Sequence, residues 1–197
     1  GYLAGAPLER YYSLSFPLLG DIPLAPDGRV RTLAYQASHR YSDCYLSGGM
    51  RCTDWHDPHS QTYRDVDGVR LVGRFDDRQC TSCHASKADS AGIVRHTHHP
   101  LMSPGSRCVS CHMPYLQHPE IGSAIRYARS DHSIPIPRPA FDNGLGVQPA
   151  CVGCHRDRAL ATLESDVTRW YGVLKPHKRI VAEQLGAHDQ AGATAAA

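Results

Sequence analysis

A pattern of two cysteines and a histidine, Cys-x-x-Cys-His, occurs three times in the chain, at residues 80–84, 108–112 and 151–155. This is the attachment pattern of c-type haem, because two thiols so spaced can bond to the two vinyl groups of one haem while the adjacent imidazole binds its iron. The pattern predicts three covalently bound haem c groups. The residues expected to hold them are Cys80, Cys83, Cys108, Cys111, Cys151 and Cys154, with His84, His112 and His155 as iron ligands.

A Cys-x-x-Cys pair has two other common uses in proteins. A structural zinc site pairs two such motifs but does not require a histidine directly after each second cysteine. A thioredoxin-like redox pair needs one motif near a βαβ pattern, and no such pattern is visible. The histidine that follows all three pairs favours haem at each of them.

The composition is poor in the residues that build an ordinary core. The 197 residues include two tryptophans and three phenylalanines against 17 glycines and 14 prolines. Such a chain is expected to be rich in loops and marginally stable alone. We therefore expect a mainly irregular fold with a few α-helices and little or no β-sheet. The haems are expected to serve as its core, so that the chain without haem is largely unfolded.

Charge and hydropathy narrow the partners and the compartment. A formal net charge of +2 gives no reason to expect nucleic-acid binding, and no apolar run approaches the roughly 20 residues of a membrane span. Covalent haem attachment takes place outside the cytoplasm, so a periplasmic or extracellular location is expected. No signal-like segment opens the chain, which is consistent with prior removal of an export signal.

The pattern of prolines, glycines and apolar residues divides the chain. A helix is predicted at about residues 156–171, where apolar residues recur at helical spacing, and a shorter one at 177–185. Residues 120–150 are rich in proline and are expected to be extended. The low-complexity tail from residue 186 should be disordered unless a partner orders it. The expected parts are an irregular arm at 1–37, a haem-binding domain at 38–175, and a helix and tail at 176–197 that form a possible docking segment.

Several strings occur together in a recognisable order. They are GGMRCTDWHDPHS, HTHHP, CVSCHMP, DHSIPIPRP, PACVGCH and TRWYG. Together they resemble the multihaem c-type cytochromes of the doubled-CXXCH kind, the group that includes cytochrome c-554 and multihaem nitrite reductases. The resemblance covers about residues 29–175. It implies closely stacked haems, mostly with two histidine ligands each, and a role in electron transfer.

The chain departs from that family at the first string. Where the family has Cys-x-x-Cys-His, this chain has Cys52 and His56 with Trp55 in place of the second cysteine. We expect that a fourth haem has been lost, with the indole filling part of its space. Cys44 and Cys52 would then be disulfide partners in an oxidising compartment. The competing interpretation is a haem held by Cys52 through a single thioether bond.

The second iron ligands decide between an electron carrier and an enzyme, because catalysis at an iron needs an open position. The family strings supply three candidates: His59, His132, and one of the pair His98 and His99. Three candidates for three haems favour two histidines on every iron. His96 is interpreted as a surface residue, and methionine ligation at Met102 or Met113 is a weak alternative. His39 and His118 are interpreted as bystanders.

These observations favour an electron-transfer protein over an enzyme. The chain is expected to exchange electrons with other c-type cytochromes or redox proteins, as a periplasmic carrier or as the repeating subunit of an extracellular filament. Self-polymerisation through the termini would explain an ordered tail. The alternatives are an oxidoreductase that acts on a small nitrogen or sulfur species at one open haem, and an electron-transfer subunit of a larger complex.

Overall fold

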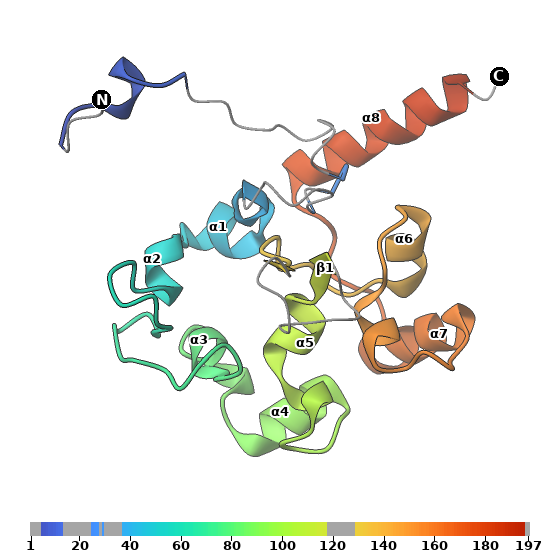
Figure 1. The fold of residues 1–197 in the computed structure, drawn as a ribbon. Coiled ribbons are helices and arrows are strands. Elements are labelled where there is room, and N and C mark those ends of the chain that lie inside the picture. The colour runs from blue at the N-terminus through green and yellow to red at the C-terminus, as the bar shows by residue number, and fades with distance from the viewer. Residues whose placement is uncertain (1–4, 14–24, 28, 30–36, 118–128, 196–197) are drawn as a thin grey trace.

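The computed structural model describes residues 5–13, 25–27, 29, 37–117 and 129–195. Short helices follow one another around the body of the molecule and are joined by loops (Figure 1). The α-helices are α1 (Asp43–Gly48), α2 (Cys52–Trp55), α3 (Arg78–Thr81), α4 (Ser90–Thr97), α5 (Cys108–His112), α6 (Pro139–Gly144), α7 (Leu160–Tyr171) and α8 (Arg179–Ala195). Single 3-10 turns lie at η1 (Leu8–Arg10), η2 (Ala37–Tyr41), η3 (Ala85–Lys87), η4 (Pro104–Ser106) and η6 (Ala150–Gly153).

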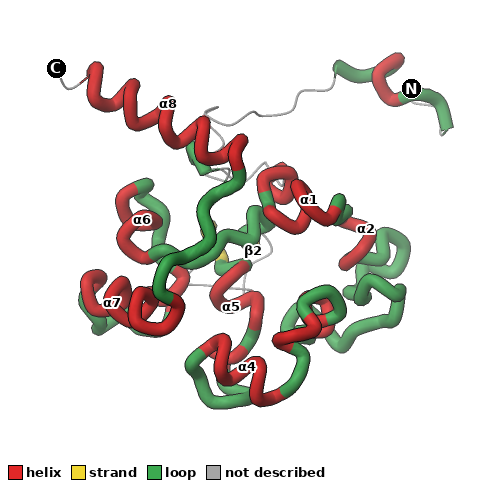
Figure 2. The backbone as a smooth tube through the Cα atoms, turned by 180° about the vertical axis from the view of Figure 1, so that it is seen from behind, coloured by secondary structure: helices red, strands yellow, loops and turns green. Residues whose placement is uncertain are grey.

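The strands are few and short. In the described part of the chain, β1 (Tyr115–Gln117) pairs antiparallel with β2 (Arg129–Ser130), with Tyr115 opposite Ser130. Helices and loops account for nearly all of the remaining backbone (Figure 2). The expected fold class, mainly irregular with some α-helix and little β-sheet, is confirmed. That haems form its core remains a prediction.

The C-terminal helices differ from the sequence prediction in length. Helix α7 begins at Leu160 and not near residue 156, because residues 156–158 form turns after the third cysteine motif. Its apolar face is as predicted, with Leu163 and Val167 buried. Helix α8 runs to Ala195, through the tail that was expected to be disordered. The tail is rich in alanine, the residue with the highest helix propensity, and the helix projects away from the body (Figures 1 and 2).

The proline-rich linker contains a helix as well. Helix α6 begins at Pro139, where a proline costs nothing because the first helical N–H has no partner within the helix. The Ala140 N–H donates to the Glu164 carboxylate of α7 at 2.9 Å, and the two helices pack side by side. The expectation of an extended linker is therefore wrong for residues 139–144. Residues 118–128, which include His118, lie outside the described residues.

The apolar core is small. One cluster joins Trp55 of α2 to Val109 of the second motif and to Met113, which follows that motif. Buried polar residues are numerous in the described part, and the guanidinium of Arg29 lies among them. It pairs with Asp27 at 2.5 Å and with Asp142 of α6 at 2.9 Å. Part of the expected N-terminal arm is therefore packed into the body of the molecule.

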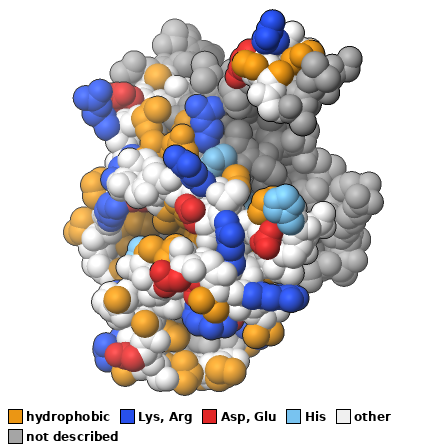
Figure 3. Space-filling model, turned by 90° about the vertical axis from the view of Figure 1, so that its left-hand side faces the viewer, with side chains coloured by type: hydrophobic (Ala, Val, Ile, Leu, Met, Phe, Trp, Pro, Cys, Tyr) orange, Lys and Arg blue, Asp and Glu red, His pale blue; other side chains and the backbone are white. Residues whose placement is uncertain are grey.

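The surface carries no dominant charge on the face drawn in Figure 3. Basic and acidic side chains are interspersed there with apolar ones, in keeping with the formal net charge of +2. Among the described residues, no helix has both the length and the hydropathy required to cross a membrane.

Candidate functional site

Each Cys-x-x-Cys-His motif is folded as a helical turn. The His84 N–H donates to the Cys80 carbonyl at 3.0 Å, and the His155 N–H donates to the Cys151 carbonyl at 2.9 Å. The second motif forms α5 itself. This turn brings the first cysteine and the histidine of a motif to the same side of the backbone. A single group could therefore contact both side chains.

The second motif lies between the other two. The thiols of Cys80 and Cys108 are hydrogen-bonded to each other, and the Cys108 N–H donates to Asp77 Oδ1 at 2.9 Å. At the other end of α5, burial raises the pKa of Cys111 to about 11, helped by the nearby thiols of Cys151 and Cys154. The three motifs therefore lie next to one another in the same order as in the sequence, although His112 and His155 are 43 positions apart.

One pair of histidines joins α4 to the second motif. The rings of His96 and His112 are nearly parallel, at 5°, with centroids 6.0 Å apart. His112 Nδ1 lies 2.9 Å from the Pro135 carbonyl. Because a carbonyl oxygen only accepts, Nδ1 must carry the hydrogen, and Nε2 of the neutral ring keeps its lone pair. Burial lowers the pKa of both rings, which favours this neutral form.

A second pair joins the loop after α4 to the third motif. The His99 and His155 rings have centroids 5.9 Å apart, at 39°. His99 Nδ1 lies 2.6 Å from the Thr97 carbonyl, so its Nε2 also keeps a lone pair. Gly105 makes room for this ring, since a Cβ at that position would lie 2.2 Å from His99 Cδ2.

A third pair forms at the degenerate first string. The His56 and His132 rings have centroids 6.5 Å apart, at 33°. His132 Nδ1 lies 2.9 Å from the Ser130 carbonyl. The Asp131 carboxylate accepts hydrogen bonds from the Ser133 N–H and hydroxyl, which fixes the turn that carries His132. Burial lowers the pKa of His56 and His132.

The three pairs share a ring separation that would suit one metal atom between two imidazoles. Two imidazoles bound through nitrogen to opposite sides of one iron have ring centroids about 6.2 Å apart, from a metal–nitrogen bond of about 2 Å and about 1.1 Å from nitrogen to ring centre on each side. Aromatic rings in ordinary contact span about 4.5–7 Å, so the separation alone is not diagnostic. The fixed tautomer is the second indication, because one ring of every pair has Nε2 available.

The histidines predicted as second ligands have different neighbours in the structure. His99 faces His155, whereas the neighbouring His98 stacks on Trp170 with centroids 4.6 Å apart and planes at 9°. His132 lies against His56 and not against a histidine of an intact motif. His59 is exposed, and so is His84 of the first motif.

Sequence reasoning missed two members of the pairs, His96 and His56. His96 was interpreted as a surface residue, yet it is partly buried, and Tyr171 of α7 donates a hydrogen bond to its carbonyl. The spacing of His96 and His99, three positions apart at the end of a helix, was the available signal. His56 was interpreted only as a remnant of the lost motif.

The predicted disulfide between Cys44 and Cys52 is not formed in the structure, where both thiols are free. Burial raises the pKa of Cys44, and the thiols that act on it most strongly are those of Cys80 and Cys83. Cys52 is exposed. The pairing of these two cysteines remains a prediction.

Comparisons of the chain with protein-family models, curated proteins and solved structures found no match. Within the described residues, no group of three or more His, Cys, Asp or Glu side chains is arranged to hold a metal ion. A haem iron requires at most two protein ligands because the porphyrin supplies four. Paired histidines beside paired thiols therefore fit haem better than a bare metal ion.

Proposed function

We propose that the chain is an electron-transfer protein that carries a covalently bound haem c on each of its three Cys-x-x-Cys-His motifs. The observation that carries the proposal is the arrangement of His112 and His155. Each belongs to a motif, and each faces a second histidine, His96 or His99, at the separation expected for two ligands of one iron. The resemblance to multihaem cytochromes points the same way.

The residues of each motif have separable tasks. The two thiols would hold the haem by covalent bonds, and the adjacent imidazole would ligate its iron. The second histidines that face His112 and His155 would leave those two irons no position open for a substrate. A haem c bound in this way supplies an iron that accepts and releases one electron with little rearrangement.

Hydrogen bonds to backbone carbonyls hold the imidazoles in place. The bonds from His112 to Pro135 and from His99 to Thr97 fix the tautomer and the orientation of each ring. Such outer contacts also make the ligating nitrogen more basic. The chain is thereby organised to keep the same ligands in both oxidation states.

The order of the motifs supports transfer from site to site. The contact between Cys80 and Cys108, and the proximity of Cys111 to the third motif, put the second motif in the middle. An electron donor and an electron acceptor would then bind near opposite ends of the row of three motifs. We propose other c-type cytochromes or redox proteins as these partners, in the periplasm or outside the cell.

The test is a count of haems and a survey of their ligands in the purified holoprotein. Low-spin electron-paramagnetic-resonance signals alone, with no optical response to carbon monoxide after reduction, are expected for ligation by two histidines. A protein that carries no covalent haem after expression with a cytochrome c maturation system would contradict the proposal.

One observation favours an alternative at the first motif. His84 is exposed to solvent, which is compatible with an iron that takes an external ligand. The chain would then be an oxidoreductase for a small nitrogen or sulfur species. A high-spin signal that responds to carbon monoxide, and that is lost in a Cys80→Ser/Cys83→Ser variant, would favour this alternative.

The projecting helix α8 bears on the assembly state. The segment before it is tied to α1, because Lys175 pairs with Asp43 and Lys178 Nζ lies 2.6 Å from Ser47 Oγ. The helix itself extends beyond the body (Figure 1). A filament built through the termini requires such a contact element, whereas a soluble carrier and a subunit of a larger complex do not polymerise. Electron microscopy of the holoprotein distinguishes the filament from the other two.

A further inference from the structure

We propose that the degenerate string from Cys52 to His56 holds a fourth haem, attached by one thioether bond from Cys52 and ligated by His56 and His132. This inference rests on the proposed function, since it assumes that the chain is loaded with haem. It reverses the expectation that this site was lost. Three features support it: the local fold of α2, the histidine that lies opposite His56, and the pocket beside these residues.

The degenerate string keeps the local fold of the intact motifs. The His56 N–H donates to the Cys52 carbonyl at 2.9 Å, which matches the corresponding bonds of His84 and His155 at 3.0 and 2.9 Å. Cys52 and His56 therefore have the same backbone relation as the first cysteine and the histidine of a complete motif. Only the second thiol is missing.

His132 supplies the opposite ligand. Its ring centroid is 6.5 Å from that of His56, close to the separations of 6.0 and 5.9 Å in the other two pairs. Its Nδ1 donates a hydrogen bond to the Ser130 carbonyl. Nδ1 of His112 and Nδ1 of His99 make the same kind of bond to the carbonyls of Pro135 and Thr97.

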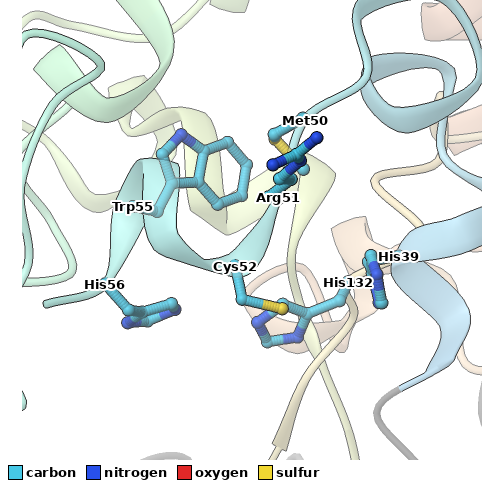
Figure 4. Close-up of a pocket in the computed structure, with 7 residues that line it drawn as sticks. All are labelled: His39, Met50, Arg51, Cys52, Trp55, His56 and His132. Atoms are coloured by element: carbon cyan, nitrogen blue, oxygen red, sulfur yellow. The ribbon is translucent and has the colours of Figure 1, made fainter. Parts of the chain in front are cut away.

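A pocket lies beside this pair (Figure 4). It is open to solvent and has a volume of about 100 Å³, and its walls are formed by His39, Met50, Arg51, Cys52, Trp55, His56 and His132. Met50 and Trp55 offer apolar contact to a ring, and Arg51 offers a cation to a propionate.

The side chain of Trp55 does not occupy the space between His56 and His132. It points toward Met50 and away from His56 and His132 (Figure 4). It is 7% exposed and packs in the apolar cluster with Val109 and Met113. The position of the missing thiol is therefore taken by a residue of the core, and the space between the two histidines is left to the pocket.

Cys52 is available for the bond. It is exposed and free in the structure, and its sulfur projects toward the part of the pocket that holds His132 (Figure 4). In the attachment step, the thiol adds across one vinyl C=C bond. The S–H bond and the π bond break, one C–S and one C–H bond form, and no net oxidation occurs. The second vinyl group remains intact.

The experiment is a count of covalent haems on the full chain, expressed with a cytochrome c maturation system. Mass measurement of the denatured protein should give four haems. Trypsin cleaves after Arg51, so the peptides 41–51 and 52–64 separate Cys44 from Cys52. The fourth haem should be on peptide 52–64. A Cys52→Ser variant should retain three covalent haems, whereas the matched variant Cys44→Ser should retain four.

The other outcomes separate the two proposals. Three haems, with Cys44 and Cys52 joined by a disulfide or both free, would overturn the fourth site and leave the proposed function intact. A fourth haem that acidified organic solvent extracts, or that is found on peptide 41–51, would overturn the thioether at Cys52. A chain without any haem would overturn both proposals.

Discussion

Replacement of Gly105 by alanine should displace the ring of His99. A Cβ at this position would lie 2.2 Å from His99 Cδ2 and 2.8 Å from Nε2. Ordinary van der Waals contact between carbon atoms begins near 3.5 Å, so the ring must move by about 1.3 Å. Ligand geometry tolerates errors of about 0.5 Å. Overpacking of this kind costs roughly 1–3 kcal/mol, and we expect the displaced ring to lose its proposed bond to iron.

The assay is carbon monoxide binding to the reduced holoprotein, together with electron paramagnetic resonance of the oxidised form. Gly105→Ala should convert one low-spin haem to a form that binds carbon monoxide. Gly144→Ala is the matched control, because nothing lies within 4 Å of its new methyl group, and it should leave both signals unchanged. A Gly105→Ala protein with the ligand spectrum of the wild type would refute the assignment of His99.

Three further predictions follow from the same structure. Arg29→Met should lower the free energy of unfolding by about 3–5 kcal/mol near neutral pH, because it leaves two buried carboxylates without their cation. The control Arg78→Met, at an exposed position, should lower it by less than about 1 kcal/mol. Denaturant unfolding of the two holoprotein variants measures both effects. Burial already raises the pKa of Asp142, and loss of Arg29 should raise it further. The stability lost in Arg29→Met should therefore become smaller as the pH falls toward the range in which this carboxyl is protonated. A loss of stability that grew on acidification would contradict this reasoning. His96→Ala should open one iron to carbon monoxide, whereas His98→Ala should not. Chain produced without haem should lack most of its far-ultraviolet helical signal.

The sequence alone was enough to predict those parts of the candidate site whose residues are close together in the chain. A covalent attachment motif requires its residues at fixed spacing, so the three motifs could be identified without a structure. The small apolar content likewise predicted a fold of short helices and loops. Helix α8 was predicted too short because low complexity was given more weight than the high helix propensity of alanine.

The histidine pairs could not be predicted in the same way. Which ring faces which depends on contacts between segments far apart in sequence, such as α5 with the loop that carries Pro135. His96, His98 and His99 are equivalent by composition, and only their positions at the end of α4 separate them. His98 takes a left-handed backbone conformation, with φ of 55°, which turns it away from the direction of its neighbours.

The stacking of His98 on Trp170 has a consequence for how the protein matures. Three imidazoles within four positions offer an iron nearly equivalent choices, and a chain that bound the wrong one would be held in a misfolded state by a strong bond. The stacked indole holds the ring of His98 in place and so would keep this histidine from competing with His96 and His99 for an iron. We therefore expect that removal of Trp170 would slow the approach to the proposed set of ligands even where the final structure is unchanged.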